Sequence, residues 1–104
     1  MSAVLEFTMN HFQQEISLNT ISQEAAMTKN AFCKYFKKRT NKTYVTFLNE
    51  LRIEEASKLL QAEKDLSITE IAEACGFQNI SNFNRKFKQL KGKTPRDFRK
   101  SLGL

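Results

Sequence analysis

The chain contains an internal repeat of about 50 residues, and this repeat limits the folds that it can adopt. The segment SLNTISQEAAM (17–27) matches SITEIAEACGF (67–77) in residue class at an offset of 50. Beyond the following turn the offset becomes 51, so that Phe32 matches Phe83. A one-residue insertion in the second turn accounts for the change. Two copies of one small unit are therefore expected within the 104 residues.

Each copy has the pattern of two short helices joined by a tight turn. In the second copy, Ser67 and Glu70 have the spacing of a capping box at the start of a helix. Gly76 is expected to end that helix in the left-handed conformation, and Phe77 to fold back as an apolar plug. We expect Ser81 to cap the next helix. The apolar residues expected to face inward are Ile68, Ile71, Ala72 and Cys75 in the first helix and Phe83, Phe87 and Leu90 in the second.

The first copy follows the same pattern more loosely. Its first helix is expected over residues 18–26, and Thr28 is expected to cap the second. Ala26 and Asn41 stand where the second copy has Gly76 and Gly92, and asparagine also tolerates the left-handed conformation. The inward residues of the second helix are expected to be Phe32, Tyr35 and Phe36.

The segments around the two copies also predict helices. Residues 43–61 favour one long helix, about 27 Å in length at 1.5 Å per residue. Residues 3–14 predict an extra helix on the first copy, and Thr94 with Pro95 starts a last short helix. The sequence contains no run of alternating apolar residues with hairpin turns, so no sheet is predicted. The expected fold is all-α with about seven helices, arranged as a first helix-turn-helix subdomain (1–42), a linker helix (43–61) and a second helix-turn-helix subdomain (62–104).

Basic residues gather in two islands at equivalent places in the repeat. Residues 28–49 hold six Lys or Arg and no acid, and residues 84–100 hold eight, with Asp97 alone opposing them. The islands therefore contain 14 of the 17 basic residues and one of the 11 acids. A merely solvated surface would mix both signs, so this distribution predicts one polyanion contacted at two places.

Other function classes find no support in the sequence. No apolar run is long enough to span a membrane, and residues 1–15 lack the apolar block of a signal peptide, so we do not expect export. Cys33 and Cys75 have no CxxC partner, and with His11 they cannot easily fill a zinc site, so we expect reduced thiols in a cytoplasmic protein without metal or cofactor. The sequence contains no glycine-rich phosphate loop and no paired nucleophile and base, so it does not indicate an enzyme. It also contains no aromatic stacking platform, so it does not indicate RNA binding.

A second helix rich in Asn, Lys and Arg is typical of a helix-turn-helix that inserts this helix into the major groove of DNA. The pattern I..IA...GF.....F.R.FK...G.TP..FR, from Ile68 to Arg99, resembles the DNA-binding domain of the AraC/XylS family of bacterial transcription regulators. The resemblance covers nearly the whole chain. It implies sequence-specific binding of double-stranded DNA by two helix-turn-helix subdomains across adjacent major-groove segments.

The resemblance also implies partners beyond DNA. Family members commonly carry a separate effector or dimerisation domain, and none fits in 104 residues, so we expect a longer full-length protein. Members can also contact RNA polymerase. The alternative function is therefore a protein-interaction module that contacts an acidic partner or RNA polymerase. The acids that could form a polymerase-contacting surface are Glu50, Glu54, Glu55 and Glu73.

Arg85 is the strongest candidate for base contact, because it lies midway between inward Phe83 and Phe87 and must turn outward. Its guanidinium suits guanine O6 and N7, although a phosphate contact or an ion pair with Asp97 is the alternative. Ser81 and Asn82 lie in the first turn of the same helix, where capping competes with base contact. Ile80 can contact a thymine methyl or pack within the turn.

The remaining candidates follow from the resemblance and from the basic islands. The family's groove-facing positions in the first copy fall on Asn30, Cys33 and Lys34. Lysines elsewhere on the two helices suit phosphates, which position a protein without specifying sequence. These phosphate candidates are Lys29, Lys37, Lys38, Lys86, Lys88 and Lys91.

Overall fold

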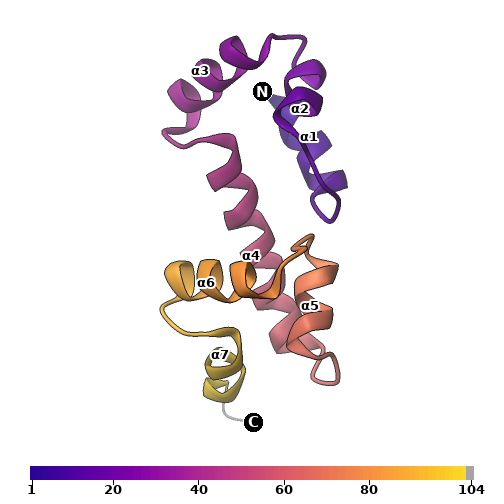
Figure 1. The fold of residues 1–104 in the computed structure, drawn as a ribbon, viewed down its shortest axis with the longest axis vertical. Helices are drawn as coiled ribbons and strands as arrows, with labels where there is room; N and C mark the ends of the chain where they lie inside the picture. Colours follow the sequence, from indigo (N-terminus) through magenta and orange to yellow (C-terminus); the bar gives the residue numbers. More distant parts are fainter. Residues whose placement is uncertain (103–104) are drawn as a thin grey trace. The chain divides into compact units, whose positions relative to one another are not determined.

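The computed structural model describes residues 1–102, which form seven α-helices and no strand. The predicted all-α class is therefore confirmed (Figure 1). The helices are α1 (Ser2–His11), α2 (Leu18–Glu24), α3 (Lys29–Thr40), α4 (Tyr44–Ala62), α5 (Ile68–Ala74), α6 (Ile80–Lys91) and α7 (Pro95–Ser101). None of the helices in this described part is long and apolar enough to cross a membrane. The helix expected over 18–26 is shorter than predicted, since α2 ends at Glu24.

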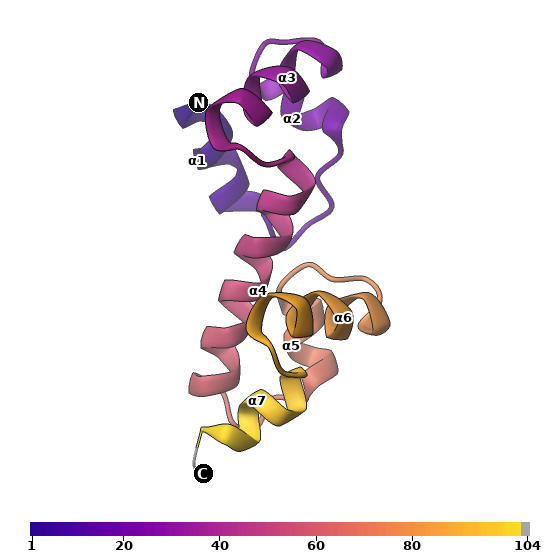
Figure 2. The same cartoon turned by 90° about the vertical axis from the view of Figure 1, so that its left-hand side faces the viewer.

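The chain divides into two compact units, residues 1–48 and residues from 49 onward. The long predicted helix is α4, and its first five residues belong to the first unit while the rest belong to the second. Figures 1 and 2 show one pair of short helices in each unit, α2 with α3 and α5 with α6, each pair joined by a short turn.

The first unit is built around aromatic rings. Phe32 and Phe36 on α3 are both 0% exposed, and their rings contact the ring of Tyr44 at the start of α4. The Tyr44 hydroxyl shares a hydrogen bond of 2.7 Å with the hydroxyl of Thr8, which ties α1 to the same core. Tyr35 is only half-buried, because it lies at the edge of this face, where the Arg39 guanidinium covers its ring.

The second unit has one apolar core beneath α6. Phe83 and Phe87 are again 0% exposed, and Phe77 packs on Phe83 with ring centroids 5.0 Å apart. The prediction for Leu90 is wrong, because this side chain is 44% exposed and the core ends on this helix at Phe87. The core residues are Ile53, Ala56, Leu60, Ile71, Ala72, Cys75, Phe77, Phe83 and Phe87.

The starts of α2 to α7 are capped by side chains, with one difference from the sequence prediction. The capping box of Ser67 and Glu70 is present, with both hydrogen bonds at 3.0 Å. The cap of α6, however, is Asn79 and not Ser81, because the Asn79 side chain accepts a hydrogen bond of 3.0 Å from the Asn82 backbone. The repeat explains this, since Thr28, which caps α3, lies 51 residues before Asn79.

The two turns have the same backbone geometry although their sequences differ. Ala26 takes a φ of 56° where Gly76 takes 93°. The next backbone N–H then donates to an equivalent carbonyl in each copy, Met27 to Ser22 at 2.9 Å and Phe77 to Ala72 at 3.0 Å. A left-handed alanine is strained by about 1–2 kcal/mol, so the first copy keeps this turn against a local cost.

Replacing Ala26 with glycine should relieve that strain. Because glycine also gains freedom in the unfolded chain, the net effect of Ala26→Gly is expected to be a stabilisation of about 0.5–1 kcal/mol. Urea unfolding followed by circular dichroism measures it. The matched control is Ala25→Gly, where φ is −86° and glycine should destabilise the chain. A loss of stability in Ala26→Gly would contradict the strained turn.

Candidate nucleic-acid interface

The outer face of α3 is set by its two buried phenylalanines. At 100° per residue, Lys34 lies almost opposite the midpoint between Phe32 and Phe36. Asn30 lies one turn before Lys34 on the same face, and Cys33 lies on the flank. All three predicted base-contacting residues of α3 are exposed, so the helix presents them together.

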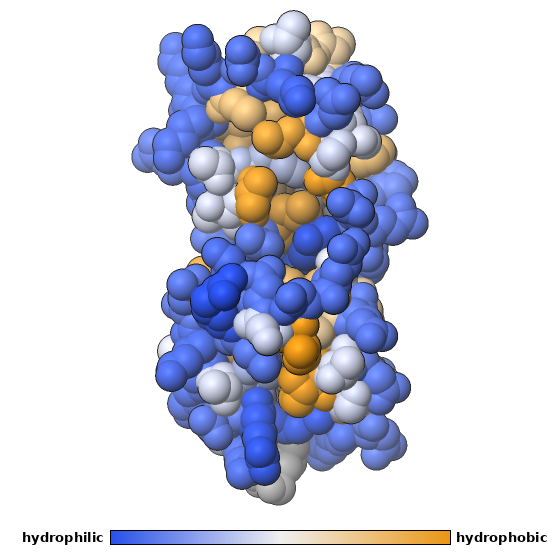
Figure 3. All heavy atoms as spheres, in the orientation of Figure 1, coloured by the Kyte–Doolittle hydropathy of each residue, from blue (hydrophilic) through white to orange (hydrophobic). Residues whose placement is uncertain are grey.

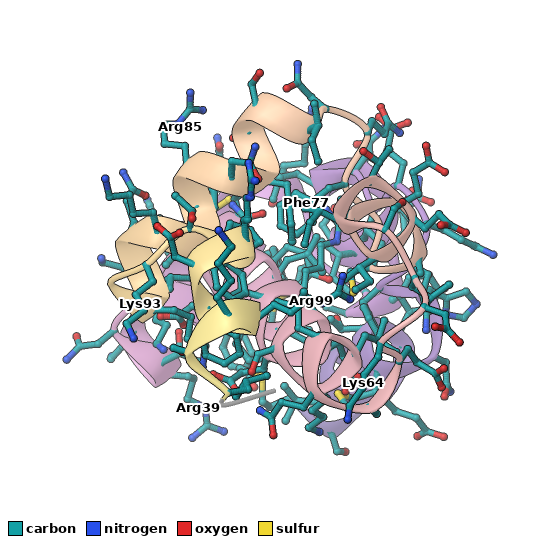
Figure 4. All side chains as sticks on the ribbon, turned by 90° about the horizontal axis from the view of Figure 1, so that it is seen from below. Arg39, Lys64, Phe77, Arg85, Lys93 and Arg99 are labelled. Carbon is teal, nitrogen blue, oxygen red and sulfur yellow. The ribbon has the colours of Figure 1, made fainter. Side chains whose placement is uncertain are left out.

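The outer face of α6 repeats this arrangement. Arg85 lies opposite Phe83 and Phe87 and is exposed, as Lys34 is on α3. Figure 4 shows the Arg85 side chain extending outward from α6, whereas Phe77 lies among the side chains of the interior. Ser81 is exposed one turn before Arg85, and because Asn79 is the cap, the Ser81 hydroxyl is not needed at the helix start.

Asn82 occupies a different position from its neighbours. It is half-buried, and its side-chain oxygen accepts a hydrogen bond of 2.8 Å from Nη2 of Arg85. The alternative ion pair of Arg85 with Asp97 does not form; the guanidinium is held by its own helix. The equivalent of Asn82 on α3 is Ala31, so Lys34 has no amide at this position. Asn82 thus orients Arg85 in the second copy alone.

The predicted phosphate-contacting lysines fall into two groups. Lys29, Lys37, Lys38 and Lys88 are exposed, and Lys86 is half-buried. Lys91 differs, because its ammonium forms an ion pair with Glu54 on α4 and its side chain is only 22% exposed. A phosphate contact by Lys91 would compete with that ion pair. Figure 3 shows mostly hydrophilic side chains over the face of each unit that is turned to the viewer.

Sequence reasoning missed Asn84 as a candidate. Asn84 is exposed on the flank of α6, and the offset of 51 carries Cys33 to this position. The repeat therefore contained the signal that would have found it. An asparagine side chain can bond to adenine N6 and N7, whereas the thiol of Cys33 offers only weak hydrogen bonding.

The two cysteines lie in opposite environments. Cys33 is exposed on the flank of α3, and Cys75 is buried in the core of the second unit. Burial raises the pKa of the Cys75 thiol to about 11, with the Glu55 charge contributing to the same direction. Among residues 1–102, no group of three or more His, Cys, Asp or Glu side chains is arranged to hold a metal ion.

The chain matches the family model described as "Helix-turn-helix domain" over residues 21–101. It belongs to this family, and specifically to the AraC-type helix-turn-helix DNA-binding domains of transcription regulators. In this chain, each of the two units carries an exposed basic helix on a buried aromatic pair.

The relatives that the chain matches include longer regulators. The chain is 30% identical to the uncharacterized HTH-type transcriptional regulator YobQ of Bacillus subtilis, over 96% of this chain and 41% of that protein. It is 29% identical to the transcriptional activator RhaS of Pectobacterium carotovorum, over 95% of this chain and 35% of that protein. The DNA-binding domain of AdpA, solved in complex with a target DNA, shares the fold with a TM-score of 0.90 at 24% identity, over 96% of this chain and 89% of that one.

The difference between the two cysteines can be measured with a thiol reagent. At pH 8, Cys33 should react with a maleimide within minutes, whereas Cys75 should react only when the chain unfolds. The reason is that a thiol with a raised pKa holds little thiolate at this pH, and Cys75 is also 1% exposed. Mass spectrometry with and without urea counts the labels. Two labels on the folded chain at pH 8 would contradict the buried position of Cys75.

Proposed function

We propose that this chain binds double-stranded DNA at specific sequences to regulate transcription, with α3 and α6 each inserted into the major groove. The observation that carries the proposal is the match between the two outer faces, because Lys34 and Arg85 occupy the same position opposite equivalent buried phenylalanine pairs. Membership of the family and the likeness to a domain solved with its target DNA support it.

Base contacts are assigned to the outer residues of the two helices. Arg85 donates to guanine O6 and N7, with Asn82 holding the guanidinium in place. Lys34 takes the same position in the first copy as a mobile point charge. The other residues within reach of base edges are Asn30, Cys33, Ser81 and Asn84.

Phosphate contacts are assigned to the exposed lysines that flank these faces. Lys29, Lys37 and Lys38 serve the first half-site, and Lys86 and Lys88 serve the second. Such contacts release counterions, so five of them would lower affinity roughly 500-fold between 50 and 200 mM salt, and each further contact would add to this loss. A steep salt dependence together with sequence preference distinguishes this function from binding to an acidic protein.

The activity of the longer protein is a wider proposal. The chain spans about a third to two fifths of the length of three of the relatives that it matches, which are named as transcriptional regulators or activators. We infer that an effector or dimerisation domain, contact with RNA polymerase and a cytoplasmic location belong to the full-length protein, as they would in a regulator of this family.

Arg85 and Lys88 should differ in the kind of binding that they provide. Arg85→Ala is expected to cost about 1–3 kcal/mol and to relax preference at one base pair, because a bidentate contact is lost. Lys88→Ala should weaken binding to all duplexes alike. Asn82→Ala should relax preference at the same base pair as Arg85→Ala but with a smaller loss. Fluorescence anisotropy against a panel of single-base variants measures these effects, and an equal loss on every duplex in Arg85→Ala would make Arg85 a phosphate contact.

The target of one chain should consist of two unlike segments. The outer residues of α3 and α6 differ, so the half-sites need not be symmetric and no palindrome is required. Selection of duplexes from a random pool, followed by footprinting and a stoichiometry titration, tests this. We expect one chain to protect two different major-groove segments about one helical turn apart. A palindromic site occupied by two chains, with one groove contact each, would contradict the proposal that one chain inserts both α3 and α6 into the major groove.

A further inference from the structure

Each unit has a small hollow beside the second helix of its pair, α3 in the first unit and α6 in the second. The two hollows correspond residue by residue. The repeat has an offset of 50 before the turn and 51 after it. When the offset is added to the number of each residue that lines the first hollow, the result is a residue that lines the second. The first hollow, about 290 Å³, is lined by Leu18, Cys33, Thr43, Tyr44 and Val45. The second, about 370 Å³, is lined by Ile68, Asn84, Thr94, Pro95 and Arg96, together with Thr69 and Ile80. The hollow is therefore a property of the repeated unit.

The chemistry of the two hollows is different. No charged side chain lines the first, and at its rim Val45 is 55% exposed. In the second hollow the same position is Arg96, which is exposed and has no ion-pair or hydrogen-bond partner within residues 1–102. The repeat thus places an apolar group in one copy and a guanidinium at the equivalent point of the other.

Arg96 also lies among other cations. It lines a neighbouring hollow of about 430 Å³ together with Lys64, Arg99 and Lys100, and none of the described residues that line this hollow is acidic. Figure 4 shows Arg99 and Lys64 on the part of the second unit away from Arg85. Like charges at this spacing repel one another, and a bound anion relieves the repulsion. The field around Arg96 therefore favours an anionic ligand.

The position of the hollow on the reading helix suggests which anion this is. The major groove is about 12 Å wide, and a helix with its side chains is about 10–12 Å across. A helix inserted into the groove consequently has its flanks against the two sugar–phosphate walls. Asn84 lies on the flank of α6, where it borders both the outer face and the hollow. Arg96 belongs to α7 and not to the inserted helix, so across the hollow it is set against the wall and not the base edges.

We propose that Arg96 binds a backbone phosphate at the edge of the second half-site, and that Val45 leaves the first half-site without this contact. The inference rests on the proposed insertion of α6 into the major groove. A guanidinium suits phosphate oxygens because it can donate two parallel hydrogen bonds. Binding at the second half-site therefore releases one more counterion than binding at the first.

The salt dependence of binding tests this, because each phosphate contact adds about 0.9 to the slope of log K against log salt. Arg96→Val should lower that slope by about 0.9 and reduce affinity about eightfold at 0.1 M salt, without changing base preference. Val45→Arg should raise the slope by a similar amount. Circular dichroism melts of each variant verify that the fold is intact.

Two controls separate a direct contact from the general effect of charge. Lys100→Val removes the same charge from the neighbouring hollow only, and its slope should change much less than that of Arg96→Val. A duplex with one methylphosphonate at the contacted position should lose as much affinity as Arg96→Val, and the two changes together should not add. Unchanged slope in Arg96→Val, an equal change in Lys100→Val, or full additivity would overturn the inference while DNA binding stands. If the unaltered chain binds no duplex, the proposed function fails as well.

Discussion

The burial of two phenylalanine pairs sets which residues the chain can offer to DNA. Phe32 with Phe36, and Phe83 with Phe87, are fully buried one turn apart on α3 and α6. Rotating either helix forward by one position would expose both rings, at about 1.5–3 kcal/mol each, and would turn Lys37 or Lys88 inward. The rotation of each helix is therefore fixed by the core, and the identity of the outer residues is free to vary.

The turn between the helices shows that the repeat preserves geometry more strictly than sequence. Ala26 and Gly76 both take positive φ, and each turn closes with a hydrogen bond from the next N–H to a carbonyl five residues earlier. The strain at Ala26 is tolerated because Phe32, Phe36 and Tyr44 pack around the turn's far end and hold α3 in place. Tertiary packing overrides a local preference here.

Periodicity predicted the helices, the buried phenylalanines and the capping box from the sequence, because these depend on residues close in the chain. The prediction failed where a local rule was applied against the repeat. Ser81 is a good capping residue, but the offset of 51 places the cap at Asn79. The ion pair of Lys91 with Glu54 joins residues 37 apart, and no local pattern could indicate it.

The two copies share a scaffold and differ at the residues that we propose contact DNA. Arg85 is planar, donates in a fixed fork and is held by Asn82, whereas Lys34 is a flexible point charge beside Ala31. A guanidinium that is already held in place loses little conformational freedom on binding, and its fixed donors fit a wrong base poorly. A flexible ammonium can instead adapt to several acceptors. The second copy should therefore discriminate between bases more sharply than the first. The positions of Cys33 and Asn84 follow the same division, since the amide offers a good donor and acceptor for adenine, whereas the thiol bonds only weakly. If α3 and α6 bind DNA as proposed, one half of the chain therefore specifies sequence while the other adds affinity with looser preference.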